Sequence, residues 1–224
     1  MESSPYELRR GDALFIVDVQ NDFCPGGRLA IDKGDAVLPV LNRWVAAAEA
    51  KSVPIYASRD WHPVDHVSFS SAGGPWPVHC VQDTEGAAFH PDLKLPSQTN
   101  VATKGVRFDK DQNSAFDDTG IAVHLKNKGI RRLLIGGLAQ DVCVKATVID
   151  ALEAGFQVVL LVDATRPVSV EGGRKALESM AQAGAKLLRE PRPPAEDICL
   201  TAPEWAEHAR PAEPEDACDD GRAG

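Results

Sequence analysis

Short apolar segments alternate with helix-like segments along most of the chain, and this alternation restricts the fold more than any other feature. Segments rich in β-branched and apolar residues predict strands at 13–19, 53–58, 100–103, 131–137, 156–162 and 185–188. Apolar residues at helical spacing predict helices at 36–50, 119–128, 142–153 and 170–183. Strands that alternate with helices of this length indicate βαβ units. The sequence therefore predicts an α/β fold with a mostly parallel central sheet.

The charge of the chain is concentrated at one end. The 224 residues include 24 basic and 33 acidic ones, a net charge of −9, which argues against nucleic acid or an anionic membrane surface as partner. Residues 191–224 hold nine acidic residues, three basic residues and six prolines. We therefore expect one domain over residues 1–190 and a mobile, acidic, proline-rich tail over 191–224.

The composition also indicates where the protein works. No stretch approaches the roughly 20 continuous apolar residues of a membrane span, and no secretory signal is evident. The five cysteines are an odd number in a chain of this size, which makes a disulfide framework improbable. We expect a cytoplasmic protein in which a thiol is available for chemistry.

Three reactive side chains are predicted at the carboxyl ends of strands, where open parallel sheets bind their ligands. Asp18 lies near the end of the first strand, Lys104 follows the third, and Cys143 lies just past the fourth. We expect Cys143 in the first turn of a helix, where backbone N–H groups and the helix dipole lower a thiol pKa. Alternatively, Cys143 is a small buried apolar residue that packs the helix onto the sheet. A carboxylate in an apolar strand is costly unless paired or functional, so Asp18 favours a nucleophile with its base.

A long segment without periodicity, residues 59–96, contains a second group of candidate functional residues. Asp60 and His62 are two residues apart, and His66 and His79 follow in the same segment. Carboxylate and imidazole ligands suit Zn²⁺, Fe²⁺ or Mn²⁺, and the spacing does not choose among them. A scatter of surface histidines is the alternative. No glycine-rich phosphate-binding spacing follows a strand, so we expect no nucleotide cofactor.

Four motifs together resemble the nicotinamidase/pyrazinamidase branch of the isochorismatase-like cysteine hydrolases. They are Asp18–Gly27, Arg59–His66, Trp76–Cys80 and Gly137–Cys143, and the resemblance runs in the family's order from about residue 13 to residue 188. It implies a three-layer αβα, Rossmann-like fold. It also implies an amidohydrolase of NAD salvage that converts nicotinamide to nicotinate and ammonia, and pyrazinamide to pyrazinoate.

The same resemblance implies a role for each motif residue. In a Cys-Asp-Lys triad, Cys143 attacks the carboxamide carbon, Asp18 takes and returns the proton, and Lys104 orients the pair. Backbone N–H groups of Ala139 and Cys143 form the oxyanion hole, next to a cis peptide bond between Leu138 and Ala139. One divalent metal (Zn, Fe or Mn) binds the pyridine nitrogen and is held by Asp60, His62 and His79. His66 matches a position that is a ligand in only some members. The implied substrate contacts are Phe23, Trp76, Leu138 and Ala139.

Two departures from the family pattern bear on substrate preference. Gln140 stands where the family often has threonine, and Asn113 where it commonly has an aromatic residue. Both positions are expected near the substrate. Two alternative functions remain. The first is a related cysteine hydrolase that acts on an N-carbamoyl or ureido compound, and such hydrolases generally lack the metal loop. The second is a binding protein without catalytic activity. The expected partner is a small molecule, and the fold often self-associates into homo-oligomers.

Overall fold

The core of the protein is a six-stranded sheet in which all neighbouring strands run parallel. The computed structural model describes residues 7–189, and the strand order is β3-β2-β1-β4-β5-β6. The strands are β1 (Asp12–Val17), β2 (Ile55–Asp60), β3 (Asn100–Lys104), β4 (Arg132–Leu138), β5 (Gln157–Arg166) and β6 (Lys186–Leu188). The predicted α/β fold is confirmed, while the predicted tail at 191–224 lies outside the described residues.

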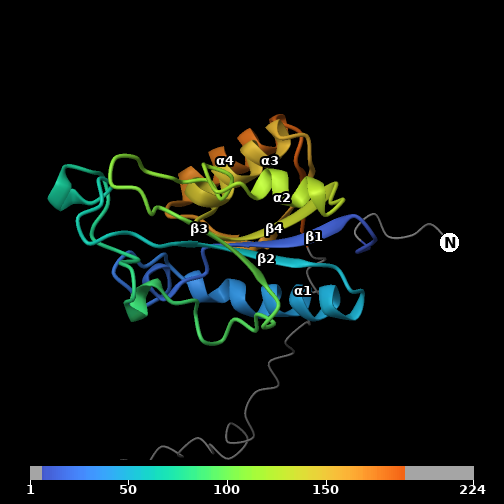
Figure 1. The fold of residues 1–224 in the computed structure, drawn as a ribbon, viewed down its shortest axis with the longest axis horizontal. Coiled ribbons are helices and arrows are strands. Elements are labelled where there is room, and N and C mark those ends of the chain that lie inside the picture. Colours follow the sequence, from blue (N-terminus) through green and yellow to red (C-terminus); the bar gives the residue numbers. More distant parts are fainter. Residues whose placement is uncertain (1–6, 190–224) are drawn as a thin grey trace, which may run out of the picture. The chain divides into compact units, whose positions relative to one another are not determined.

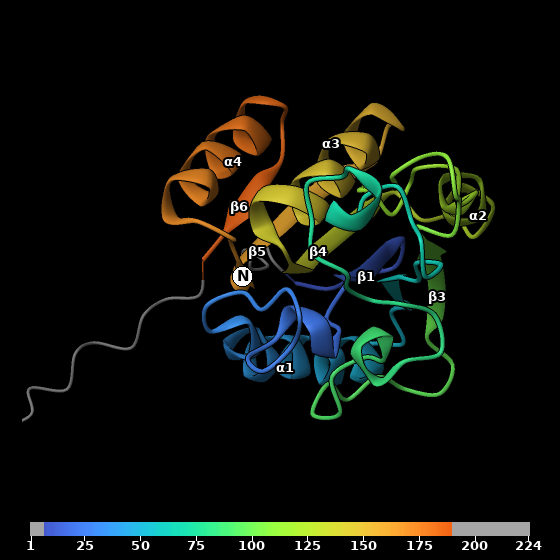
Figure 2. The same ribbon diagram turned by 90° about the vertical axis from the view of Figure 1, so that its left-hand side faces the viewer.

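Helices cover both faces of the sheet and complete three layers. They are α1 (Leu38–Ala50), α2 (Ile121–Asn127), α3 (Lys145–Glu153) and α4 (Val170–Gln182). Figure 1 shows α1 below the sheet and the other three helices above it, and Figure 2 shows the same layers end-on. No helix within residues 7–189 is long and apolar enough to cross a membrane.

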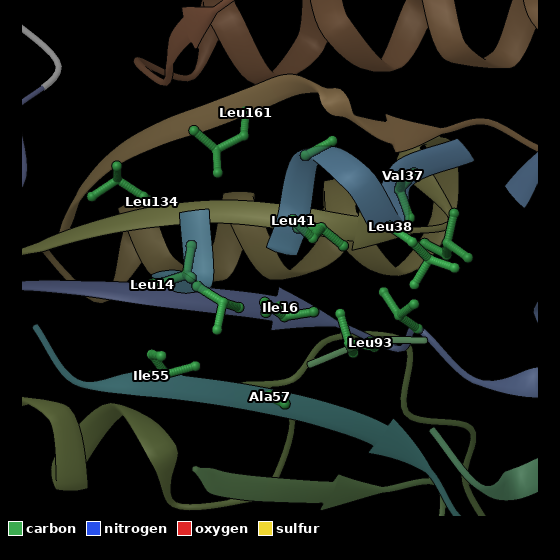
Figure 3. Packing of buried hydrophobic residues seen from close by; sticks show 14 of the residues in the cluster. Leu14, Ile16, Val37, Leu38, Leu41, Ile55, Ala57, Leu93, Leu134 and Leu161 are labelled. Atoms are coloured by element: carbon green, nitrogen blue, oxygen red, sulfur yellow. The ribbon is translucent and has the colours of Figure 1, made fainter. Parts of the chain in front are cut away.

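The residues of β1 explain why the sheet is buried on both faces. All six are buried, as expected for a central parallel strand with a continuous apolar run. Successive side chains of a strand point to opposite faces. Leu14 and Ile16 therefore pack with Leu41 on the α1 side (Figure 3), while Phe15 and Val17 join the cluster on the side of the other three helices.

Two strands extend by more than one residue beyond their predicted ends. β2 was expected to stop at Ser58, but its pairing with β3 continues to Asp60, which lies opposite Lys104. β5 continues past the polar Asp163 to Arg166 because it resumes pairing with β4 after a register shift. Asp60 is therefore a strand residue with a fixed neighbour and does not belong to the loop.

The crossover between β2 and β3 has no α-helix. It contains two 3₁₀ turns, Ser70–Ala72 and Glu85–Ala87, and single bridges such as His62 with Val81. Coloured teal to green, this segment lies in front of the strand ends in Figure 2. The long predicted loop is thus placed over the carboxyl edge of the sheet, where a parallel sheet binds its ligands.

Candidate active site

Four adjacent strands each bring one reactive side chain to the carboxyl edge of the sheet. In the order β3-β2-β1-β4 these residues are Lys104, Asp60, Asp18 and Cys143. The strand order reverses between β1 and β4, because β2 and β3 lie on one side of β1 and β4 leads away on the other. Such a switch point opens a crevice beyond the strand ends. The fold itself therefore gathers residues that are up to 125 positions apart in the chain.

Lys104 is the centre of the buried group. Its Nζ atom lies 2.9 Å from Asp18 Oδ2, 2.5 Å from Asp60 Oδ1 and 3.6 Å from Cys143 Sγ. Lys104 and Asp18 have no exposed surface. Carboxylate oxygens of Asp18 and Asp60 and the sulfur of Cys143 all lie within 4.8 Å of one another. The structure thus brings the three predicted triad residues into one contact group.

The surroundings set the charge of this group. Burial raises the pKa of Asp18, with Lys104 acting in the opposite direction. Burial disfavours the Lys104 ammonium, but Asp18 and Asp60 outweigh it and raise the pKa of Lys104 well above its usual value. Burial likewise opposes ionisation of Asp60, but Lys104 and His62 prevail and lower its pKa. A permanent cation is therefore held between two carboxylates, and the one with the higher proton affinity faces the thiol.

The expectation of a low thiol pKa at Cys143 is wrong for this structure. Residues Gln140–Val144 form one turn of π-helix ahead of α3, so Cys143 does not lie in the first turn of an α-helix. Burial raises the pKa of Cys143 well above the ordinary value, although Lys104 works against this. The resting group is consequently a neutral thiol, and its proton must pass to a base before it can attack. The Leu138–Ala139 peptide bond that precedes this turn is cis.

Ser58 is a member of the site that sequence reasoning missed. This residue of β2 is fully buried, and its hydroxyl donates a hydrogen bond of 2.6 Å to Asp18 Oδ1. Asp18 has a left-handed backbone (φ 48°), a costly conformation for a residue with a side chain. The missed signal was a polar residue inside an apolar strand, the same signal that drew attention to Asp18.

Asp60, His62 and His79 form a second group with their ligand atoms within 4.8 Å of one another, and all three are buried. The Nδ1 atom of His62 lies 2.9 Å from the Gly105 carbonyl, and that of His79 lies 2.7 Å from the Pro77 carbonyl. Each Nδ1 must therefore carry a proton and donate it, so that in the neutral form of each ring the lone pair lies on Nε2. Histidine ligands of metals are oriented in this way. The donor set fits a divalent metal ion.

Gly105 shapes the pocket of His62. A Cβ atom at this position would lie 2.4 Å from the imidazole carbon of His62, and the glycine has φ +68°. Only a residue without a side chain can therefore place its carbonyl here to accept the hydrogen bond from His62. The glycine that follows Lys104 is thus required by the second group as well as by the turn.

His66 is buried next to this group but does not belong to it. Its ring lies 4.2 Å from that of His62, and its Nδ1 atom is 2.7 Å from the hydroxyl of Ser68. Its Nε2 atom is buried and makes no hydrogen bond to any described residue. Burial and the neighbouring His62 lower the pKa of His66, which favours the neutral ring. Its ring nitrogens are not among the atoms that lie within 4.8 Å of one another in the Asp60–His62–His79 group, and its part in metal binding stays a prediction.

A single pocket of about 440 Å³, its open mouth included, joins the two groups. Cys143 and Ala139 line it together with Asp60, His62 and His79, and the predicted ring contacts Phe23 and Trp76 form part of its wall. Sequence reasoning missed the other wall residues, which are Leu29, Ile31, Asp111, Gln112, Val142 and Val168.

Two expected pocket residues lie elsewhere. Leu138 is fully buried in the hydrophobic core and does not line the pocket. Gln140 turns away and donates a hydrogen bond of 2.6 Å to Thr165. Asn113 does line the pocket. Of the two departures from the family pattern, only Asn113 is placed to contact a ligand.

Comparisons with known proteins identify the family and match the fold. A profile described as the Isochorismatase domain matches residues 12–190. The chain is 38% identical over 198 residues to a nicotinamidase of Escherichia coli K12, covering 78% of this chain and 93% of that one. A zinc complex of a Pyrococcus horikoshii pyrazinamidase superposes with a TM-score of 0.78 and 42% identity, over 80% of this chain and 99% of that chain. The nicotinate complex of PnC1 from L. infantum superposes with a TM-score of 0.73 and 40% sequence identity. The match covers 80% of this chain and 92% of that chain.

Proposed function

The chain belongs to the isochorismatase family and is a hydrolase acting on amides, and from that premise we propose that it is a nicotinamidase. It converts nicotinamide and water to nicotinate and ammonia, and pyrazinamide to pyrazinoate. The observation that carries the proposal is one pocket in which Cys143 and the Asp60–His62–His79 group face the same space. A pyridine carboxamide fits both parts of this pocket, because its carboxamide can face Cys143 while its ring nitrogen faces the Asp60–His62–His79 group.

The thiol of Cys143 is the nucleophile. Its sulfur bonds to the carboxamide carbon while its proton passes to Asp18, whose raised pKa makes it a competent base for a thiol. Backbone N–H groups of Ala139 and Cys143 are the proposed donors to the oxyanion. Asp18 then gives its proton to the carboxamide nitrogen, and the C–N bond breaks. Ammonia is released, and the acyl group remains bound to Cys143 as a thioester.

Water completes the cycle by the reverse sequence. Asp18 removes a proton from the attacking water, the C–S bond breaks, and the proton returns to the sulfur, so that the carboxylic acid is released and the thiol is regenerated. Throughout both halves Lys104 stays charged and holds Asp18 within 2.9 Å. It thereby limits the build-up of negative charge at the buried group.

Asp60, His62 and His79 are the proposed ligands of a divalent metal, which supplies a Lewis-acidic site for the pyridine nitrogen when bound. Phe23 and Trp76 lie on the pocket wall and provide faces for the ring. The three described cysteines are free thiols, as expected in a reducing compartment. We place the proposed activity in the cytoplasm, and its role in NAD salvage follows from the proposed substrate alone.

Ammonia release from nicotinamide by protein of known metal content tests this function. Turnover should fall on chelation and return with Zn²⁺, Fe²⁺ or Mn²⁺. It should disappear in Cys143→Ala, while Cys24→Ala, which removes a buried thiol outside the pocket wall, should retain it. If metal-loaded protein does not hydrolyse nicotinamide but does hydrolyse an N-carbamoyl compound, the proposed substrate is wrong and the N-carbamoyl compound takes its place.

A further inference from the structure

Two buried polar side chains near the cysteine site have no part in the chemistry described above. Gln20 and Asp22 follow Asp18 in the segment between β1 and α1, and their exposed fractions are 0% and 5%. Buried polar side chains are retained only where their hydrogen bonds are satisfied. Their partners therefore indicate what they do.

Gln20 binds the backbone of Asp60. Its Oε1 atom accepts the N–H of Asp60 at 2.8 Å, and its Nε2 atom donates to the carbonyl of the same residue at 2.7 Å. The second hydrogen of Nε2 goes to the Ala87 carbonyl at 2.8 Å. The pairing of β1 with β2 ends at Ile16 and Ala57. Gln20 thus takes the place of a neighbouring strand for the last residue of β2.

Asp22 holds the segment that contains His79, another member of the Asp60–His62–His79 group. Its Oδ2 atom accepts the backbone N–H of Cys80 at 2.7 Å. Cys80 follows His79 directly, has a left-handed backbone (φ 45°), and its carbonyl accepts the N–H of His62 at 2.9 Å. One carboxylate therefore fixes the segment from which both histidine ligands are placed.

We propose that Gln20 and Asp22 are positioning residues of the metal centre, an inference that rests on the proposed function of Asp60, His62 and His79. His62 and His79 lie in the crossover, which has no regular element apart from two 3₁₀ turns, so side-chain bonds to its backbone help to determine where they lie. Asp60 ends β2 next to β3, and Gln20 holds its backbone on the side where the pairing with β1 has ended. Loss of groups that orient metal ligands typically lowers metal affinity by about 10–100-fold. The same range is expected for Gln20→Met, which keeps the length of the side chain and removes all three hydrogen bonds.

Asn42 offers a matched control. Its Nδ2 atom donates to the Asp92 carbonyl at 2.8 Å, and its Oδ1 atom accepts the Lys94 N–H at 2.9 Å. It is therefore also an amide that holds the backbone of the crossover, but away from every proposed ligand. Asn42→Leu reports the cost of loosening this segment without touching the ligand residues.

The test measures Zn²⁺ affinity by competition with a chromophoric chelator, on protein stripped of metal, together with the urea midpoint of the stripped protein. We expect Gln20→Met to bind Zn²⁺ about 10–100-fold more weakly than wild type, and activity to recover as Zn²⁺ is raised. Asn42→Leu should keep wild-type affinity. Asp22→Leu should lose more affinity than Asp22→Asn, which retains one oxygen acceptor for Cys80.

Unchanged affinity in Gln20→Met, or a loss no larger than that of Asn42→Leu, would overturn the positioning role and leave the proposed function intact. A wild-type protein without Zn²⁺ affinity would overturn both. If Gln20→Met fails to fold, Gln20→Glu replaces it under the same criterion, because it keeps the acceptor for the Asp60 N–H and loses both donors.

Discussion

Replacing Lys104 by methionine tests the central electrostatic argument of the site. Lys104 is fully buried, 2.9 Å from Asp18 and 2.5 Å from Asp60. Methionine has a similar length and no charge, so the substitution removes the cation and leaves the space largely filled. Two buried carboxylates then remain without their partner.

The size of the effect follows from these distances. At an effective dielectric constant of about 20, each pair attracts by about 6 kcal/mol. The desolvation of the ammonium offsets much of this gain, and removal of one partner from a buried pair typically costs about 3–5 kcal/mol. We therefore expect the free energy of unfolding of Lys104→Met to fall by about 3–5 kcal/mol near neutral pH.

The loss of unfolding free energy in Lys104→Met should depend on pH, and the two carboxylates determine whether it grows or shrinks as pH rises. Without Lys104, burial raises the pKa of both Asp18 and Asp60 above their values in the unfolded chain. A carboxyl group with a raised folded pKa favours the folded state while it is protonated, and this contribution disappears as pH rises through that pKa. The destabilisation by Lys104→Met should therefore be smallest near pH 5 and larger near pH 8.

Urea unfolding at both pH values, followed by circular dichroism, measures these differences. Lys51→Met is the control, since Lys51 pairs with Glu7 at 3.0 Å on the surface, and we expect no measurable change there. Adding Asp18→Asn to Lys104→Met should restore part of the lost stability. A loss below about 1 kcal/mol, typical of an exposed ion pair, or a loss of equal size at both pH values would refute the reasoning.

Three further predictions concern individual positions. Iodoacetamide should label Cys143 before the other described cysteines, because it alone lines the pocket, with a rate that rises steeply above neutral pH because its thiol pKa is raised. Gly105→Ala should weaken Zn²⁺ binding by displacing His62, whereas Gly129→Ala, with a similar φ of +72° and open space, should cost only backbone strain of about 1–2 kcal/mol. Asn113→Tyr should change the kcat/KM ratio between nicotinamide and pyrazinamide, and Gln140→Thr should not, because only Asn113 lines the pocket.

Each of these has a clear contrary result. Equal labelling rates of the described cysteines would mean that the pocket does not expose the sulfur of Cys143. Equal Zn²⁺ affinities for the two alanine variants would remove the steric role of Gly105. A preference that shifts with Gln140 would place that side chain nearer the ligand than its bond to Thr165 allows.

The alternating pattern was sufficient to predict the fold class, because apolar strands and amphipathic helices are local features of sequence. Asp18 was found in the same way, since a charge in an apolar strand stands out against its neighbours. Ser58 gave the weaker form of this signal, a hydroxyl in a short apolar strand, and was overlooked because a buried serine is common enough to need no explanation.

Strand order and register could not be predicted from local pattern. Nothing in residues 53–60 says that β2 lies between β1 and β3, or that its pairing extends far enough to set Asp60 against Lys104. The thiol pKa of Cys143 was misjudged for a related reason. Its sign depends on burial among residues from other strands, and the helix terminus on which the prediction relied proved to be a π turn.

The shared lysine shows why the two groups of the site should be considered together. The cysteine group and the ligand group were inferred from separate motifs, yet Lys104 contacts Asp18 of one and Asp60 of the other. When Asp18 is ionised, as the proposed proton transfer from the thiol requires, two carboxylates and one ammonium leave the buried set with one uncompensated negative charge. Burial of such a charge is unfavourable unless a cation lies nearby. His62 Nε2 lies 3.7 Å from Asp60 Oδ2, and a ring nitrogen of His79 lies within 4.8 Å of the same carboxylate. In that state the charge balance around Lys104 favours a cation at the proposed ligands.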